Sequence, residues 1–191
     1  ETRSKLEREL VSKDPLGLKK FIRTVDNFPI DGIAFRDITS LIETPEAFVK
    51  TCDELTKITR NFGADIVTSI ESRGFIFAGT IARDLNLPFV LARKPGKLPN
   101  ETYKKSFDLE YGSTSIEIQK NTEIPNNQKI VIVDDLVATG GTAIACSEIF
   151  TENFNVKSEN ILILSIIDLP ELGGSKLISE KGYLIETLIE Y

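Results

Sequence analysis

Two adjacent carboxylates followed by a glycine-rich segment form the part of this sequence best suited to chemistry. Asp134 and Asp135 directly follow four β-branched residues, Ile130–Val133, and precede the small-residue segment Ala138–Thr142. Four such residues in a row are typical of a strand buried on both faces of a sheet, so the acids are expected where that strand ends. Amides of a glycine loop that opens a helix bind phosphate, and nearby carboxylates can accept hydrogen bonds from sugar hydroxyls. The run therefore predicts a site for a sugar phosphate. The alternative is that the two acids only cap the end of a strand and the glycines only form a turn.

Two better-known phosphate loops are absent from the chain. No segment has the Gly-x-x-x-x-Gly-Lys-Ser/Thr spacing of a nucleoside-triphosphate loop or the Gly-x-Gly-x-x-Gly spacing of a dinucleotide site. Ala145 and Ile149 are four residues apart, as are Cys146 and Phe150, which predicts a helix directly after the glycines. Strand, acids, glycine loop and helix in this order are typical of a ligand site at the carboxyl edge of an open sheet.

A second set of chemically capable residues is basic. Arg93, Lys94, Lys97, Lys104 and Lys105 fall within thirteen residues of a chain whose net charge is −6. A local basic cluster on an acidic protein suggests a grip for a polyphosphate, and a solvated surface loop is the alternative. Histidine is absent, so any proton transfer must use carboxylates, lysine, tyrosine, cysteine, backbone or water.

The elements that would position these groups alternate along the chain. Thr44, Pro45 and Glu46 are typical of a helix start, with Thr44 as the cap, and the helix continues to Arg60. The charged residues 1–27 have a helical pattern, with Leu16, Phe21 and Val25 as buried contacts. Strands are predicted at residues 65–70, 88–92, 130–133, 161–167 and 183–189, a further helix at 74–86, a polar connection at 94–106, and an antiparallel half-exposed strand at 113–120. Alternating strands and helices predict a parallel-rich α/β sheet.

Composition limits the possible classes of protein. A chain of 191 residues with 41% hydrophobic and 27% charged residues suits one soluble domain with one core. The acidic balance argues against a general nucleic-acid binder. No segment approaches the ~18 apolar residues of a membrane span, and the first residues lack the apolar core of a secretory signal. Two isolated cysteines form neither a disulfide framework nor a zinc site, so a reduced, cytoplasmic setting is expected.

Five segments other than the glycine loop carry a family resemblance. Together with Asp134–Thr142 they resemble the type I phosphoribosyltransferases, and among these the adenine phosphoribosyltransferases of bacterial type. The resemblance runs from about Phe28 to Thr142 and more weakly to Tyr191, and many bacterial relatives have histidine where this chain has Gln119. The segments are Phe35–Ile38, Glu71–Phe75, Arg93–Pro99, Leu109–Gly112 and Glu117–Lys120.

The resemblance implies a fold, a reaction and partners. The fold would be a single α/β domain over residues 1–191, with a mostly parallel central sheet flanked by helices. A small N-terminal hood would occupy about residues 1–36 and a mobile catalytic loop about residues 94–112. The reaction transfers the 5-phosphoribosyl group of phosphoribosyl pyrophosphate to adenine, giving AMP and pyrophosphate in purine salvage. Mg²⁺ would be held mainly by phosphoribosyl pyrophosphate, pyrophosphate and water, without direct side-chain ligands. Such enzymes are usually homodimers, and neither nucleic acid nor membrane is an expected partner.

The resemblance also assigns roles, carried over one residue at a time. Glu110 would be the general acid or base toward purine N7 and, with Arg73, Asp134 and Asp135, would form the catalytic set. The peptide between Glu71 and Ser72 would be cis. The other expected contacts are as follows: Asp134 and Asp135 with the ribose hydroxyls; Ala138, Thr139, Gly140, Gly141 and Thr142 with the 5′-phosphate; Ser72, Arg73, Arg93, Lys94 and Lys97 with pyrophosphate; Phe35 stacked on adenine, with the backbone of Ala34 and Arg36 at its edge.

Two other functions remain open at this point. A non-catalytic sensor of phosphoribosyl pyrophosphate could keep the same loop, but such proteins tend to lose the mobile-loop residues that this chain retains as Arg93, Lys97 and Glu110. A phosphoribosyltransferase for another base would differ only in the base pocket. Relatives that use 6-oxopurines usually present a lysine to the base near the strand at 161–168, and residues 161–174 contain neither Lys nor Arg, which favours adenine.

Overall fold

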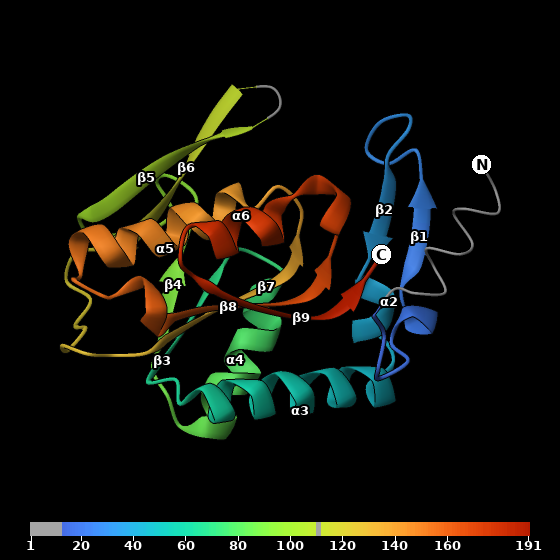
Figure 1. Cartoon of the computed structure of the whole chain (residues 1–191), viewed down its shortest axis with the longest axis horizontal. Helices are drawn as coiled ribbons and strands as arrows, with labels where there is room; N and C mark the ends of the chain where they lie inside the picture. Colours follow the sequence, from blue (N-terminus) through green and yellow to red (C-terminus); the bar gives the residue numbers. More distant parts are fainter. Residues whose placement is uncertain (1–12, 110–111) are drawn as a thin grey trace.

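The central sheet has five parallel strands in the order β4-β3-β7-β8-β9. The computed structural model describes residues 13–109 and 112–191 (Figure 1). The strands are β3 (Ile66–Ile70), β4 (Phe89–Ala92), β7 (Ile130–Val137), β8 (Ile161–Asp168) and β9 (Leu184–Glu190). The predicted parallel-rich α/β sheet is confirmed, and the middle strands are buried on both faces as their β-branched runs indicate.

Helices cover both faces of this sheet. On one face lie α3 (Pro45–Phe62) and α4 (Gly74–Leu85), packed on a core that includes Leu55, Phe77 and Leu164. On the other face lie α5 (Gly141–Asn153) and α6 (Gly174–Glu180), over a core that includes Ile132 and Phe150 (Figure 1). The short elements η1 (Lys19–Phe21), α2 (Thr39–Ile42), η2 (Ser158–Asn160) and η3 (Pro170–Leu172) complete the connections.

Helix α3 begins where the sequence predicts but differs from the prediction in its cap and in its end. Thr44 is the N-cap residue and Pro45 opens the helix, as predicted. The Thr44 hydroxyl does not cap the helix, however, because it donates instead to the carbonyl oxygen of Ser40 at 2.9 Å. The helix ends at Phe62, two residues later than predicted, where Gly63 takes up the left-handed conformation with φ 76°.

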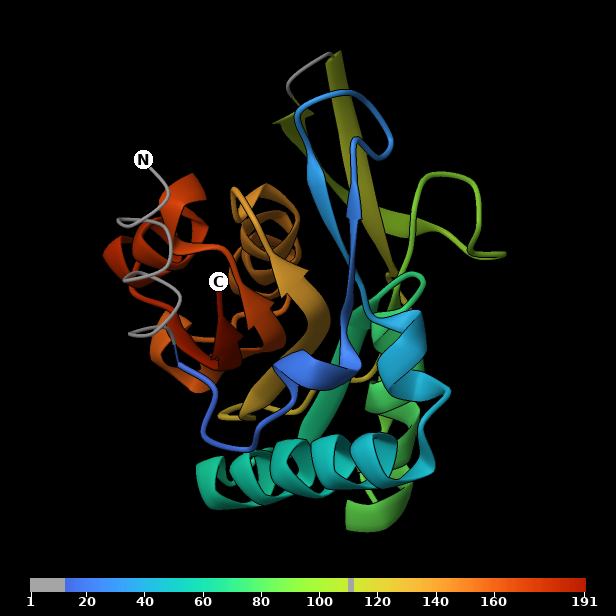
Figure 2. The same cartoon turned by 90° about the vertical axis from the view of Figure 1, so that its right-hand side faces the viewer.

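Two antiparallel hairpins extend beyond the carboxyl edge of the sheet (Figures 1 and 2). One pairs β1 (Arg23–Asp26) with β2 (Ala34–Asp37), and we call it the hood. The other pairs β5 (Thr102–Leu109) with β6 (Gly112–Gln119), and we call it the long hairpin.

The hairpins correct two predictions. The helical pattern predicted through residue 27 is wrong over Arg23–Asp26, which form a strand, and Val25 is 40% exposed rather than buried. The connection predicted over residues 94–106 already becomes a strand at Thr102, because β6 provides a partner for every residue from Thr102 to Leu109. The antiparallel strand predicted at 113–120 is confirmed as β6, and its central residues from Ser115 to Ile118 are buried.

No helix among the described residues is both long and apolar enough to cross a membrane. Cys52 and Cys146 are both buried and free, and they lie on α3 and α5, the two helices in which the sequence places them.

Candidate active site

The predicted site residues gather at the carboxyl edge of the sheet, where β3, β4, β7 and β8 all end. Parallel pairing puts the ends of these strands side by side, so residues distant in sequence meet there. Asp134 and Asp135 lie inside β7 rather than after it, which corrects the expected strand end. The strand continues to Val137 because β8 runs beside it as far as Asp168, the register partner of Val137.

The glycine loop turns from β7 into α5 as its sequence predicts. Gly140 has φ 84° and is the N-cap residue, a conformation that favours glycine. No side chain caps this helix end, so its first backbone N–H groups face the loop without an intrahelical partner. Thr139 is exposed and Thr142 is partly exposed, so both hydroxyls can reach a ligand. The arrangement suits an anion such as a phosphate.

The two carboxylates differ in their surroundings. Asp135 is 8% exposed, and its Oδ2 lies 2.6 Å from Nε of Arg73. Among the described residues Asp134 forms no ion pair, and its Oδ1 accepts a hydrogen bond from the backbone N–H of Asp135 at 2.8 Å. Removal from water, together with the neighbouring charge of Asp135, raises the pKa of Asp134 well above its usual range. The charge of Asp135 is therefore balanced by Arg73, whereas charged Asp134 would be stabilised by further hydrogen-bond donors.

The turn after β3 carries the other predicted contacts. The peptide between Glu71 and Ser72 is cis, as the resemblance implies. Oε1 of Glu71 accepts hydrogen bonds from the backbone N–H of Lys94 at 2.7 Å and from Nε of Arg93 at 3.3 Å. Partial burial acts to raise the pKa of Glu71, but these two groups outweigh it, so the pKa is lowered. The turns after β3 and β4 are thus tied together.

The basic cluster of the sequence divides into two groups. The segment Arg93–Lys97 stays at the site, where Gly96 donates its N–H to Oε2 of the buried Glu117 at 3.1 Å. Lys105 points away and contacts Glu148 at 3.0 Å and Glu152 at 2.8 Å on α5. Nζ of Lys104 lies 3.8 Å from Oε1 of Glu117. Lys105 is therefore paired with α5, and Arg93, Lys94 and Lys97 are the cations kept as candidates for binding a polyphosphate.

The hood brings an aromatic residue to the same place. The ring of Phe35 lies 5.5 Å from the guanidinium carbon of Arg73 and packs edge-on against Phe28 at 5.1 Å. Arg36 donates from Nη1 to the Thr24 hydroxyl at 2.6 Å. Arg73 thus contacts Asp135 on one side and Phe35 on the other. The predicted Glu110 lies outside the described residues.

Comparison with known proteins decides the family. A family model described as "Phosphoribosyl transferase domain" matches residues 39–181. The adenine phosphoribosyltransferase of Agathobacter rectalis is 42% identical over 174 residues, covering 91% of this chain and 97% of that protein. That of Methanococcus maripaludis is 41% identical over 177 residues, covering 92% and 99%. The chain belongs to the adenine phosphoribosyltransferase family.

Solved structures of the family have the same fold. The crystal structure of the Thermoanaerobacter pseudethanolicus enzyme has a TM-score of 0.82 and 37% identity, covering 91% of this chain and 98% of that chain. The Giardia lamblia enzyme, solved with 9-deazaadenine, has a TM-score of 0.84 and 35% identity, covering 91% and 96%. The type I phosphoribosyltransferase fold expected from the motifs is confirmed.

Three features near the site of this family member were not predicted from the sequence. Gly174 contacts the glycine loop directly, and the Gly173-Gly174 pair shortly after a buried strand was the available signal. Tyr191 stacks on Arg36, with the guanidinium carbon 3.9 Å from the ring centroid, and no local pattern announces this contact. Asp168 is 4% exposed, and its Oδ1 has no hydrogen-bond partner among the described residues. As an acid ending a buried run, Asp168 resembles Asp134 in sequence and could have been noticed.

Proposed function

We propose that this protein transfers the 5-phosphoribosyl group from phosphoribosyl pyrophosphate to adenine, forming AMP and pyrophosphate, through the site described above. The supporting observation is the position of Arg73, which lies 2.6 Å from Asp135 and 5.5 Å from the ring of Phe35. One guanidinium therefore adjoins both the carboxylates suited to a sugar and the ring suited to a base. A transferase that breaks a bond at the ribose and forms another to a base needs these groups next to each other.

We assign the phosphoribosyl group to β7 and the loop that follows it. The amides of Ala138–Thr142 and the hydroxyls of Thr139 and Thr142 would bind the 5′-phosphate. Asp134 and Asp135 would accept hydrogen bonds from the two ribose hydroxyls. The pKa of Asp134 is raised in the protein alone, and hydrogen bonds from these hydroxyls would stabilise its charged form.

Pyrophosphate and adenine would occupy the two sides of Arg73. Ser72, Arg73, Arg93, Lys94 and Lys97 would neutralise the departing pyrophosphate as the bond to the ribose carbon breaks and positive charge develops on the sugar. Phe35 would stack on adenine, and the backbone of Ala34 and Arg36 would contact the edge of the base. Glu110 would exchange the proton at purine N7, and closure of the 94–112 segment would exclude water.

We propose that a magnesium ion arrives with the substrate. The described residues include no group of three or more acidic, histidine or cysteine side chains that could enclose a metal. Mg²⁺ keeps several waters and binds readily to substrate phosphates, so it needs no complete protein cage. When bound, the ion would neutralise part of the charge of the pyrophosphate that Ser72, Arg73, Arg93, Lys94 and Lys97 would hold.

Assembly and location complete the proposal. We propose a homodimer, because edge strand β4 and the start of α4 expose Leu91 and Ile76, which are 38% and 43% accessible. Sedimentation equilibrium tests this, and a monomer at assay concentration would contradict it. Two free buried thiols agree with a cytoplasmic protein.

The decisive experiment measures AMP and pyrophosphate formation from phosphoribosyl pyrophosphate and Mg²⁺, with adenine, hypoxanthine, guanine or orotate as the base. Turnover of adenine alone is the expected result. Turnover of a different base would overturn the specificity while keeping the reaction class. Tight binding of phosphoribosyl pyrophosphate without transfer to any base would instead favour a sensor.

A further inference from the structure

The amino end of α6 lies directly behind the glycine loop. The backbone N–H of Gly174 donates to the carbonyl oxygen of Ala138 at 3.1 Å. A β carbon built on Gly174 would lie 2.3 Å from that oxygen, 2.6 Å from the nitrogen of Gly140 and 2.7 Å from the carbonyl carbon of Thr139. The contact is reciprocal, because a β carbon on Gly140 would lie 3.0 Å from the carbonyl oxygen of Gly174. Two backbone segments 34 residues apart therefore touch without any side chain between them.

Gly174 must be a glycine because there is no room for a side chain, and not because of its backbone conformation. Its neighbour Gly173 has φ 78° and Gly140 has φ 84°, both in the left-handed region that favours glycine. Gly174 is not among the residues with positive φ and is the first residue of α6, a position that alanine suits well. Only the three backbone atoms of the loop forbid a side chain there.

We propose that Gly174 is a positioning residue for the 5′-phosphate of the substrate, a role that rests on the proposed function. It touches no substrate itself and acts through Ala138, Thr139 and Gly140, whose backbone it holds from behind. A methyl group at this position would have to move from 2.3 Å to the ordinary contact distance of 3.4 Å, a displacement of about 1 Å shared between the loop and α6. Displacement of binding groups by ~1 Å can cost ~100-fold in activity.

The test compares Gly174→Ala with Gly79→Ala. Gly79 lies inside α4, and a β carbon there would meet nothing within 4 Å, so this control makes the same chemical change without crowding. In Gly174→Ala we expect KM for phosphoribosyl pyrophosphate and Kd for AMP to rise roughly 10- to 100-fold. KM for adenine should stay within about twofold, because the loop does not contact the base. Gly79→Ala should match the unmodified protein in all three constants.

The outcomes separate a positioning role from a merely structural one. A folded Gly174→Ala protein with unchanged KM for phosphoribosyl pyrophosphate and unchanged Kd for AMP would overturn the inference. A loss of kcat alone, with both constants unchanged, would indicate a smaller active fraction and would also overturn it. If neither the unmodified protein nor Gly79→Ala converts adenine to AMP, the proposed function fails first.

A second measurement needs no variant and applies even if Gly174→Ala does not fold. Amide hydrogen exchange is followed in the unmodified protein with and without AMP. Because the N–H of Gly174 donates to Ala138, AMP held by the loop should slow exchange at Gly174 at least about tenfold, together with the loop amides. Protection of the loop amides without any change at Gly174 would overturn the inference.

Discussion

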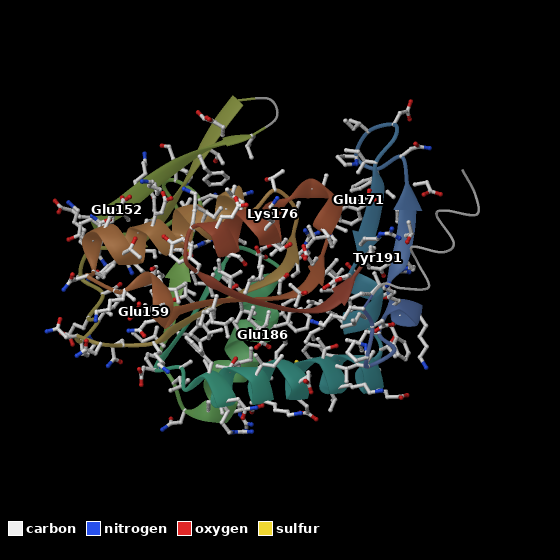
Figure 3. The ribbon with its side chains drawn as sticks, viewed as in Figure 1. Glu152, Glu159, Glu171, Lys176, Glu186 and Tyr191 are labelled. Atoms are coloured by element: carbon white, nitrogen blue, oxygen red, sulfur yellow. The ribbon has the colours of Figure 1, made fainter. Side chains whose placement is uncertain are left out.

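Replacing Tyr191 should weaken adenine binding although this residue is far from Phe35 in sequence. Tyr191 follows β9 and lies beside the hood in Figure 3. The guanidinium carbon of Arg36 lies 3.9 Å from the centroid of its ring, and Nζ of Lys19 lies 4.8 Å from the same centroid. Its backbone N–H donates to the carbonyl oxygen of Asp168 at 3.2 Å, which fixes the ring to the end of β8. Tyr191 therefore joins the hood, which carries Phe35, to the central sheet.

The size of the effect follows from the stacking contact. Arg36 and Tyr191 are both partly buried, so the cation–π interaction is worth about 1–2 kcal/mol. The hydrogen bond from Arg36 to Thr24 lies within the hood and does not hold the hood to the sheet. In Tyr191→Leu the whole stacking energy is lost from the docked hood. If adenine binds only to the docked hood, KM for adenine should rise by about 5- to 30-fold.

Tyr191→Phe is the matched control. The hydroxyl of Tyr191 is buried and has no hydrogen-bond partner in the described part of the chain, so removing it costs nothing and keeps the ring under Arg36. Steady-state kinetics at saturating phosphoribosyl pyrophosphate should give the Phe variant the adenine KM of the unmodified protein. Equal adenine KM values for the Leu and Phe variants would refute the reasoning, as would a rise confined to KM for phosphoribosyl pyrophosphate.

Three further expectations concern stability and reactivity. Asp134→Asn should abolish most turnover yet raise the melting temperature at neutral pH. Burial raises the pKa of Asp134, so the folded state favours its protonated form. The difference in melting temperature from the unmodified protein should therefore shrink as pH falls through that raised pKa. A difference that is constant between pH 4 and 8 would contradict this. Lys105→Met should lower the free energy of unfolding by about 1 kcal/mol, seen as a melting-temperature shift of about 2–4 °C, because Lys105 pairs with Glu148 and Glu152. This shift should largely disappear near ~1 M NaCl, and its persistence there would argue for lost packing instead. Burial raises the pKa of the Cys52 thiol to about 11 and raises that of Cys146 further, so both should resist a thiol reagent at pH 8 until urea unfolds the protein, and rapid labelling of the native state would be inconsistent with this burial.

The central sheet was predictable because its signal is local and strong. Runs such as Ile130–Val133 and Ile161–Leu164 are buried on both faces. Helix α3 begins with a proline and ends at a left-handed glycine, which are ordinary local signals. The hood was not predictable in this way. Arg23–Asp26 has all four residues exposed, so it has no apolar alternation, and it becomes a strand only by pairing with Ala34–Asp37. Thr102–Leu109 likewise depends on β6 for its structure.

The site was predictable where motif residues follow strands of the sheet. Asp134, Asp135, Arg73 and Arg93 meet because parallel strands end at a common edge, which is a property of the fold class. The length of β7 was not predictable, since it depends on how far β8 extends beside it. Nor could the sequence divide the basic cluster, because the glutamates that bind Lys105 lie more than 40 residues later, on α5.

The part of the chain after α5, where the family resemblance is weakest, supports the site without providing its chemistry. Gly174 holds the glycine loop from behind, and Tyr191 holds the hood through Arg36. Both contacts depend on where β8 and β9 end, and neither residue is expected to touch a reacting atom. Substitutions at these two positions should therefore change KM for one substrate each, phosphoribosyl pyrophosphate at Gly174 and adenine at Tyr191. Because the two supports share no contact in the described part of the chain, their effects in a double variant should add as free energies. Strong non-additivity would show that the loop and the hood move as one unit.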